Sequence, residues 1–95
     1  MSEKSAYRQK LEARLDQWQA EIDKLQAKAV EAGADARVEY EDQVDSLRKQ
    51  QDAAREKLKE FDEASGEAWK DLKQGIEKAW DDLSASVKKA TDKFG

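Results

Sequence analysis

The chain has 95 residues, no Pro and only four Gly, 42% of its residues are charged, and its mean hydropathy is −1.09. This length allows one domain, and the composition supplies narrow apolar stripes instead of a thick core, which excludes a sheet-based fold. The net charge is −4 with the acidic excess in residues 34–65, so the chain has no basic face for phosphate-driven binding of nucleic acid.

The first predicted helix begins after Ser2, whose hydroxyl can cap its first turn, with Glu3 near its positive end. Arg8 and Glu12 form an i,i+4 ion pair on its polar side. Apolar residues then follow at alternating steps of four and three, which is the heptad seam of helix-on-helix packing. The seam consists of Leu11, Leu15, Trp18, Ile22, Leu25 and Ala29.

A second heptad seam follows, out of phase with the first, and it is thin at Gln51 and Ala54 where large apolar groups are missing. Its members are Tyr40, Val44, Leu47, Gln51, Ala54, Leu58 and Phe61.

The two seams can be joined in two ways around Gly33. The helix can continue through an eleven-residue stutter, in which case Gly33 costs about 1 kcal/mol relative to Ala. Alternatively, Gly33 ends one helix and Asp35 caps the next, which makes a tight reversal over residues 32–35. We favour continuity, which predicts one helix over residues 4–63.

From Leu58 onwards the sequence repeats every eleven residues without a gap. Eleven residues make three helical turns, so each column of the repeat keeps its place on the helix and the apolar columns form one band. The columns are Leu58, Trp69 and Trp80; Phe61, Leu72, Leu83 and Phe94; Ser65, Ile76 and Val87; and Ala68, Ala79 and Ala90.

A turn is predicted at residues 64–66 within this repeat. Ser65 can cap a new helix, and Glu67 and Asp71 suit its first turn. The repeat keeps its phase through Ser65, which argues for an unbroken helix instead. We favour the turn because a lone chain with a buried band must fold back or find a partner, and the next helix is then expected over residues 67–94.

These elements predict an all-α fold in a single domain over residues 1–95. The expected architecture is an antiparallel coiled-coil hairpin of one long and one shorter helix. The shorter helix would leave the seam from Leu11 to Leu25 uncovered, so self-association is expected. The alternative is a three-helix bundle with an extra turn near Gly33.

The sequence offers little for catalysis. With no His and no Cys it cannot form the usual nitrogen and sulfur metal sites or a Ser-His or Cys-His nucleophile. Scattered surface carboxylates do not converge as calcium requires, so no metal, cofactor or catalytic residue is expected. Trp18, Trp69 and Trp80 lie on the seams and are interpreted as core residues. Anchoring in a membrane interface is the alternative for these indoles.

The segments Ser65–Leu72 and Gly75–Leu83 resemble a family of small bacterial coiled-coil proteins described as stress-response proteins. Residues 34–40 and Leu15–Trp18 resemble that family too, whereas Gly33 departs from its uninterrupted helix. The resemblance implies a stress-linked role and no catalytic residue. The eleven-residue repeat also loosely resembles those of apolipoproteins and desiccation-protection proteins.

We therefore expect a cytoplasmic, non-enzymatic interaction protein that associates with itself or binds a helical partner. The alternatives are reversible binding to membrane surfaces, and docking as a subunit or regulator of an enzyme. The residues expected to make the contacts, called the interaction stripe, are Leu11, Leu15, Trp18, Ile22, Leu25, Tyr40, Val44, Leu47, Leu58, Phe61, Trp69, Leu72, Ile76, Trp80, Leu83, Val87 and Phe94.

Overall fold

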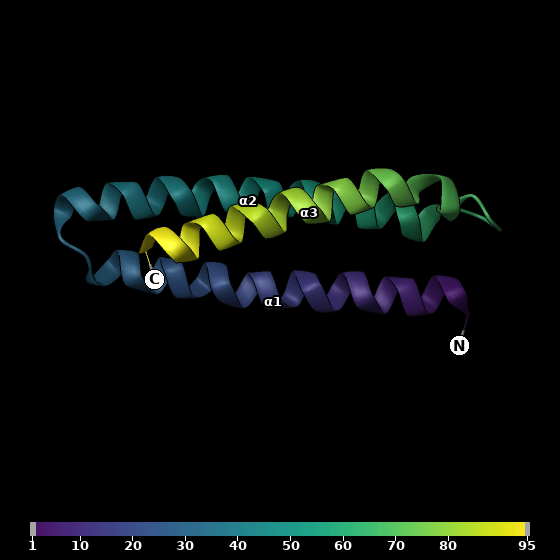
Figure 1. Ribbon diagram of the computed structural model, residues 1–95, viewed down its shortest axis with the longest axis horizontal. Coiled ribbons are helices and arrows are strands. Elements are labelled where there is room, and N and C mark those ends of the chain that lie inside the picture. Colours follow the sequence, from purple (N-terminus) through teal and green to yellow (C-terminus); the bar gives the residue numbers. More distant parts are fainter. Residues whose placement is uncertain (1, 95) are drawn as a thin grey trace.

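The computed structural model describes residues 2–94 of the chain, and this part folds into three helices with no strand. Helix α1 spans Glu3–Glu31, helix α2 spans Ala34–Glu63 and helix α3 spans Trp69–Phe94. The chain runs back and forth, so that α2 is antiparallel to both other helices (Figure 1). The molecule is a rod of 52 × 20 × 18 Å, close to the roughly 45 Å of a thirty-residue helix.

The predicted all-α class is confirmed, but the hairpin of one long and one shorter helix is not, and the three-helix bundle fits. Continuity through Gly33 is wrong, because the chain reverses at Ala32 and Gly33. Gly33, and not Asp35, is the N-cap of α2. The conformational preferences of the residues around Gly33 differ by only about 1 kcal/mol between helix and turn. Burial of apolar side chains outweighs them, since the reversal lets α2 and α3 cover the seam of α1.

The first turn is built from extended backbone. Ala32 has φ −77° and ψ 155°, Gly33 has φ −66° and ψ 164°, and neither uses the left-handed region. The N–H of Arg37 donates to the Gly33 carbonyl at 2.8 Å. The Arg37 guanidinium donates to the carbonyls of Ala29 and Val30 at 3.2 and 3.1 Å, which satisfies carbonyl groups at the end of α1. Arg37 thus contacts both ends of this turn, Gly33 through its backbone N–H and the end of α1 through its side chain.

Replacing Gly33 by Ser is expected to stabilise the protein by about 0.5 kcal/mol. The glycine has an ordinary φ, a Cβ at this position meets no atom within 4 Å, and α2 has no side-chain cap. Urea unfolding followed by circular dichroism measures the change. Gly66→Ser is the matched control and should destabilise, because Gly66 has a φ of +56°. A lower urea midpoint for Gly33→Ser would contradict the assignment of this residue as the cap.

The second reversal lies where the sequence predicts a turn, but α3 begins at Trp69 instead of residue 67. The Ala68 N–H donates to the Ser65 carbonyl at 3.0 Å. Among residues 65–68 only Gly66 has a positive φ, which is the pattern of a type II′ β-turn. Ser65 and Ala68 are exposed in this turn, so they do not join the apolar band that the repeat assigns to their columns.

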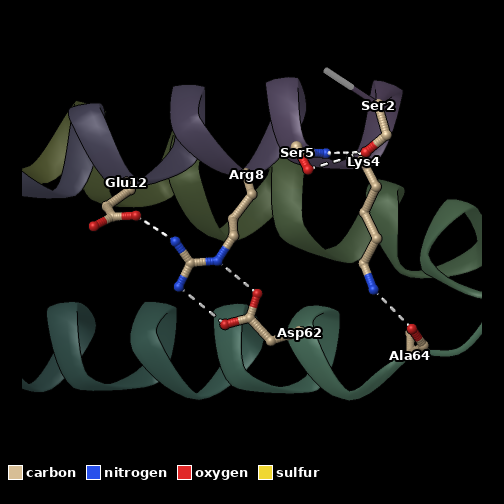
Figure 2. Close-up of polar contacts among 7 residues, drawn as sticks. All are labelled: Ser2, Lys4, Ser5, Arg8, Glu12, Asp62 and Ala64. Atoms are coloured by element: carbon tan, nitrogen blue, oxygen red, sulfur yellow. Dashed lines mark hydrogen bonds and ion pairs between the residues drawn. The ribbon is translucent and has the colours of Figure 1, made fainter.

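The N-cap predicted at Ser2 is confirmed, since its hydroxyl oxygen accepts from the Ser5 N–H at 3.1 Å (Figure 2). The apolar sides of the three helices meet along the axis of the rod and form one core cluster. Each helix contributes a buried indole or phenyl ring to that cluster: Trp18 from α1, Phe61 from α2, and Trp69 and Trp80 from α3.

Candidate interaction surface

The structure places the interaction stripe inside the bundle. Tyr40 and Leu72 are partly buried against the core, and the side chain of Phe94 lies outside the described residues. The stripe is therefore the core of one chain, and its contact with another molecule stays a prediction. The buried members are Leu11, Leu15, Trp18, Ile22, Leu25, Val44, Leu47, Leu58, Phe61, Trp69, Ile76, Trp80, Leu83 and Val87.

Trp80 occupies the middle of the core and has no exposed surface. Its indole Nε1–H donates to the backbone carbonyl of Leu11 at 3.1 Å, a buried bond between α3 and α1. Its ring lies 6.5 Å from that of Trp18, and the guanidinium of Arg14 covers Trp18 at 4.9 Å. An indole needs a hydrogen-bond partner when buried, so this bond fixes the position of α3 along α1.

Gln51 is the one buried polar residue of the described core, with 1% of its surface exposed. Its amide donates to the side-chain oxygen of Gln19 at 2.7 Å, and Arg55 donates to the same oxygen at 3.0 Å. Gln19 directly follows Trp18 in α1, so the small or polar residues of α2 lie at the level of the bulky indoles. The thin part of the second seam thus leaves room for Trp18 and Trp80, as large and small residues alternate in packed cores.

Three aromatic rings cluster where α2 turns into α3. The ring of Tyr7 lies 5.7 Å from that of Phe61 and 6.0 Å from that of Trp69. Phe61 and Trp69 meet edge-on at 5.6 Å. The ammonium groups of Lys4 and Lys70 lie over Phe61 and Trp69 at 5.6 and 5.7 Å. Each such contact stabilises by about 0.5–1 kcal/mol, and together the rings join all three helices at this end.

Tyr7 is expected to give this end of the bundle a pH-dependent stability. Burial and then the Glu77 carboxylate raise the pKa of Tyr7 above 10, and its hydroxyl donates to Glu77 at 3.4 Å. The unfolded chain ionises this phenol first, so stability is expected to fall as pH rises from about 10 through the folded pKa. Urea midpoints across this range should fall more steeply for the natural chain than for Tyr7→Phe. Equal slopes would contradict the burial of this hydroxyl.

Polar contacts link α1 to α2 along much of their length, as Figure 2 shows near the N-terminus. The guanidinium of Arg8 donates to both oxygens of Asp62, at 2.7 and 3.1 Å, and it also pairs with Glu12 as predicted. The ammonium of Lys4 donates to the Ala64 carbonyl at 2.8 Å. Arg8 and Asp62 remain about 40% exposed, which limits their pair to roughly 1 kcal/mol at most.

Further along the same pair of helices, Arg48 of α2 lies 3.3 Å from the Asp23 carboxylate and also bonds to Gln26. With the bonds from Gln51 and Arg37, these contacts tie α1 to α2 from one end to the other. The sequence does not reveal them, because each joins positions that only the register of the folded helices brings together.

Helix α3 is attached differently. Between residues 69–92 of α3 and the described residues of α1, the polar contacts are the bond from Trp80, the long bond from Tyr7 to Glu77, and an ion pair of Lys70 with Glu3 at 3.9 Å. No side-chain hydrogen bond or ion pair joins residues 41–63 of α2 to residues 69–92 of α3. The attachment of α3 therefore depends chiefly on apolar contact.

A hollow of 230 Å³ opens on the surface between α1 and α3. Two basic side chains of α1 face two carboxylates of α3 across it, a mixture that favours neither an anion nor a cation. The lining residues are Tyr7, Lys10, Leu11, Arg14, Glu77, Trp80 and Asp81.

Within the described residues, no three acidic side chains gather in a way that could hold a metal ion. Likewise, none of the helices in residues 2–94 combines the length and apolar character that crossing a membrane requires. Comparison of the chain with family models, with curated proteins and with solved structures finds no match.

Proposed function

We propose that this chain is a non-enzymatic helical interaction protein, which associates with a second copy of itself or binds a partner helix in the cytoplasm. The observation that supports this function is the attachment of α3. Its apolar band packs on an α1–α2 pair that is separately held by polar contacts. Apolar contact is less specific in direction than a hydrogen bond, so a helix with a similar band can compete for the same place.

The test uses the full chain and a synthetic helix as probe. Sedimentation over a wide range of protein concentration measures self-association, and fluorescence anisotropy measures binding of a labelled peptide with the sequence of residues 69–94. A peptide carrying Ile76→Asp is the matched control. The proposal is supported if the peptide with the natural sequence binds saturably and the Ile76→Asp peptide does not, or if the chain has a mass above that of the monomer. A monomer at every concentration that binds neither peptide contradicts it.

Reversible binding to membrane surfaces is the second candidate, favoured by one observation. Helix α3 is the most strongly amphipathic of the three described helices and has Trp69 and Trp80 on its apolar side. Such helices lie in the interface of a bilayer with their apolar side inserted. Tryptophan emission with and without anionic vesicles separates the candidates. Blue emission that vesicles leave unchanged supports protein contact, whereas quenching by brominated lipid supports the membrane.

A stress-linked role belongs to the same proposal and rests on the resemblance of residues 65–72 and 75–83 to the bacterial coiled-coil family. It is tested by comparing the growth of cells with and without this protein under osmotic, oxidative and heat stress. Equal survival under all three conditions would contradict it.

A further inference from the structure

The segment that joins α2 to α3 is a turn with the sequence of a helix. Ala64, Ser65, Gly66, Glu67 and Ala68 include no Pro and no β-branched residue, and one Gly is the only strong helix breaker among them. The four residues after Ala64 are exposed, so no core contact holds them in the turn. The turn itself is set by the positive φ of Gly66 and the bond from Ala68 to Ser65, and the bond from the Lys4 ammonium to the Ala64 carbonyl lies at its start.

The eleven-residue repeat continues through this turn in phase. Ser65 falls in the column of Ile76 and Val87, and Ala68 falls in the column of Ala79 and Ala90, although both are exposed here. A turn does not require the phase on its two sides to agree. A continuous helix does, because only then do the apolar bands of α2 and α3 lie on one line.

The turn at Gly33 differs in the phase of its flanking seams and in its side-chain bonds. The two heptad seams are out of phase across Gly33, and Arg37 bonds to the Ala29 and Val30 carbonyls around it. Side-chain bonds such as Arg8 to Asp62 then hold α1 on α2. Bonds from Arg37 thus bridge the turn at Gly33, whereas the bond from Lys4 holds the second turn at Ala64, its first residue, and residues 65–68 can straighten.

We propose that two copies of this chain exchange α3. In each copy residues 34–94 form one helix of about 90 Å, and its α3 half packs on the α1–α2 pair of the other copy. Every contact of α3 is remade with the second copy, including the bond from Trp80 to the Leu11 carbonyl. The two joining segments pass each other at the centre of the dimer, where Ala64, Ser65 and Gly66 permit close approach.

This exchange rests on the proposed function and names the second copy as the partner. Because closed and exchanged forms share the same core, the balance between them depends on the joining segment and on protein concentration. Two substitutions in that segment should shift the balance in opposite directions while leaving every core residue unchanged.

Gly66→Ala should favour the dimer, because alanine is strained at a φ of +56° and favours a helix. Two joining segments act in each dimer, so we expect its dissociation constant to fall by about a hundredfold. Ser65→Pro should favour the monomer by a similar factor, since proline breaks a continuous helix. It fits the turn, because Ala64 before it is extended, with φ −69° and ψ 130°. Sedimentation equilibrium on the full chains measures both shifts.

A cross-linking experiment distinguishes exchange from a dimer formed by outer surfaces. Lys10 and Asp81 are exposed and line the same hollow between α1 and α3. Chains with Lys10→Cys are mixed with chains with Asp81→Cys at a concentration that gives dimers, and a short bismaleimide is added. Exchange predicts a covalent link between the two chains.

The outcomes separate the two proposals. If the dimer forms with the same dissociation constant in both variants of the joining segment, and no cross-link joins the two chains, self-association is supported and exchange is overturned. A monomeric mass at every concentration for the natural chain and for Gly66→Ala overturns exchange, and then the proposed function depends on the peptide-binding test alone.

Discussion

Trp80→Ala is expected to destabilise the bundle by about 3–5 kcal/mol, a large part of the 5–15 kcal/mol typical of a small domain. Trp80 is fully buried, so the truncation leaves a cavity at the level where the core already contains Ala54 and Gln51. It also removes the bond to the Leu11 carbonyl and the ring contact with Trp18. Urea unfolding followed by circular dichroism should show a much lower midpoint.

Trp80→Phe is the matched control for this substitution. Phenylalanine keeps most of the apolar volume but cannot donate to Leu11, whose carbonyl remains within helix α1. We expect a loss of about 1–2 kcal/mol, clearly smaller than that for alanine. Equal and small losses for both variants would contradict the central position of this indole.

Ile76→Asp is the second substitution with a large expected effect, because it places a carboxylate at a position with no exposed surface. A buried charge without a partner costs several kcal/mol, so most of the chain should be unfolded without denaturant. Gln74→Asp adds the same charge to the exposed side of α3 and should change stability by less than about 0.5 kcal/mol. Far-ultraviolet circular dichroism and thermal unfolding distinguish the two.

This pair of variants tests the apolar band of α3 directly. Leu72 belongs to the same band but is only partly buried, so Ile76 is the sharper position. Similar helicity and similar unfolding temperature for Ile76→Asp and Gln74→Asp would mean that the band does not pack as the structure shows.

Periodicity predicted which residues are buried, because steps of four and three in α1 and α2, and of eleven in α3, leave few choices for the inner side of a helix. Leu11, Trp18, Leu47, Ile76 and Trp80 all lie in the core as their spacing indicates. The exception is the first block of the repeat, where Ser65 keeps the phase but lies in a turn. Periodicity describes one helix and contains no information about where the chain reverses.

The reversal at Gly33 could not be decided from its neighbours. Gly33 has a φ of −66°, which suits a helix as well as this turn, and the cost of glycine within a helix is only about 1 kcal/mol. The decision depends on the remote seam of α1, which the reversal covers within one chain. The uncovered seam was the reason to expect self-association, so that expectation now depends on the joining segment of α2 and α3 instead.

The residue pairs that make contacts between helices could also not be predicted from the sequence. Arg8 and Asp62 are 54 residues apart, and Trp80 and Leu11 are 69 apart. Their pairing follows from the register of three helices, which many small packing contacts determine together. The sequence shows Gln51 as a polar residue on the apolar seam of α2. Its hydrogen-bond partner Gln19 could not be predicted, because Gln19 lies outside the seam of α1.

Small-angle X-ray scattering, extrapolated to zero protein concentration, tests most directly whether the three helices close on one another within a single chain. The Cα radius of gyration of the bundle is 15.4 Å, and the scattering of a dilute monomer should give a value close to this. A hairpin with a continuous helix over residues 4–63 would be about 90 Å long, with a radius of gyration of roughly 26 Å. A monomeric mass combined with that larger value would contradict the three-helix bundle.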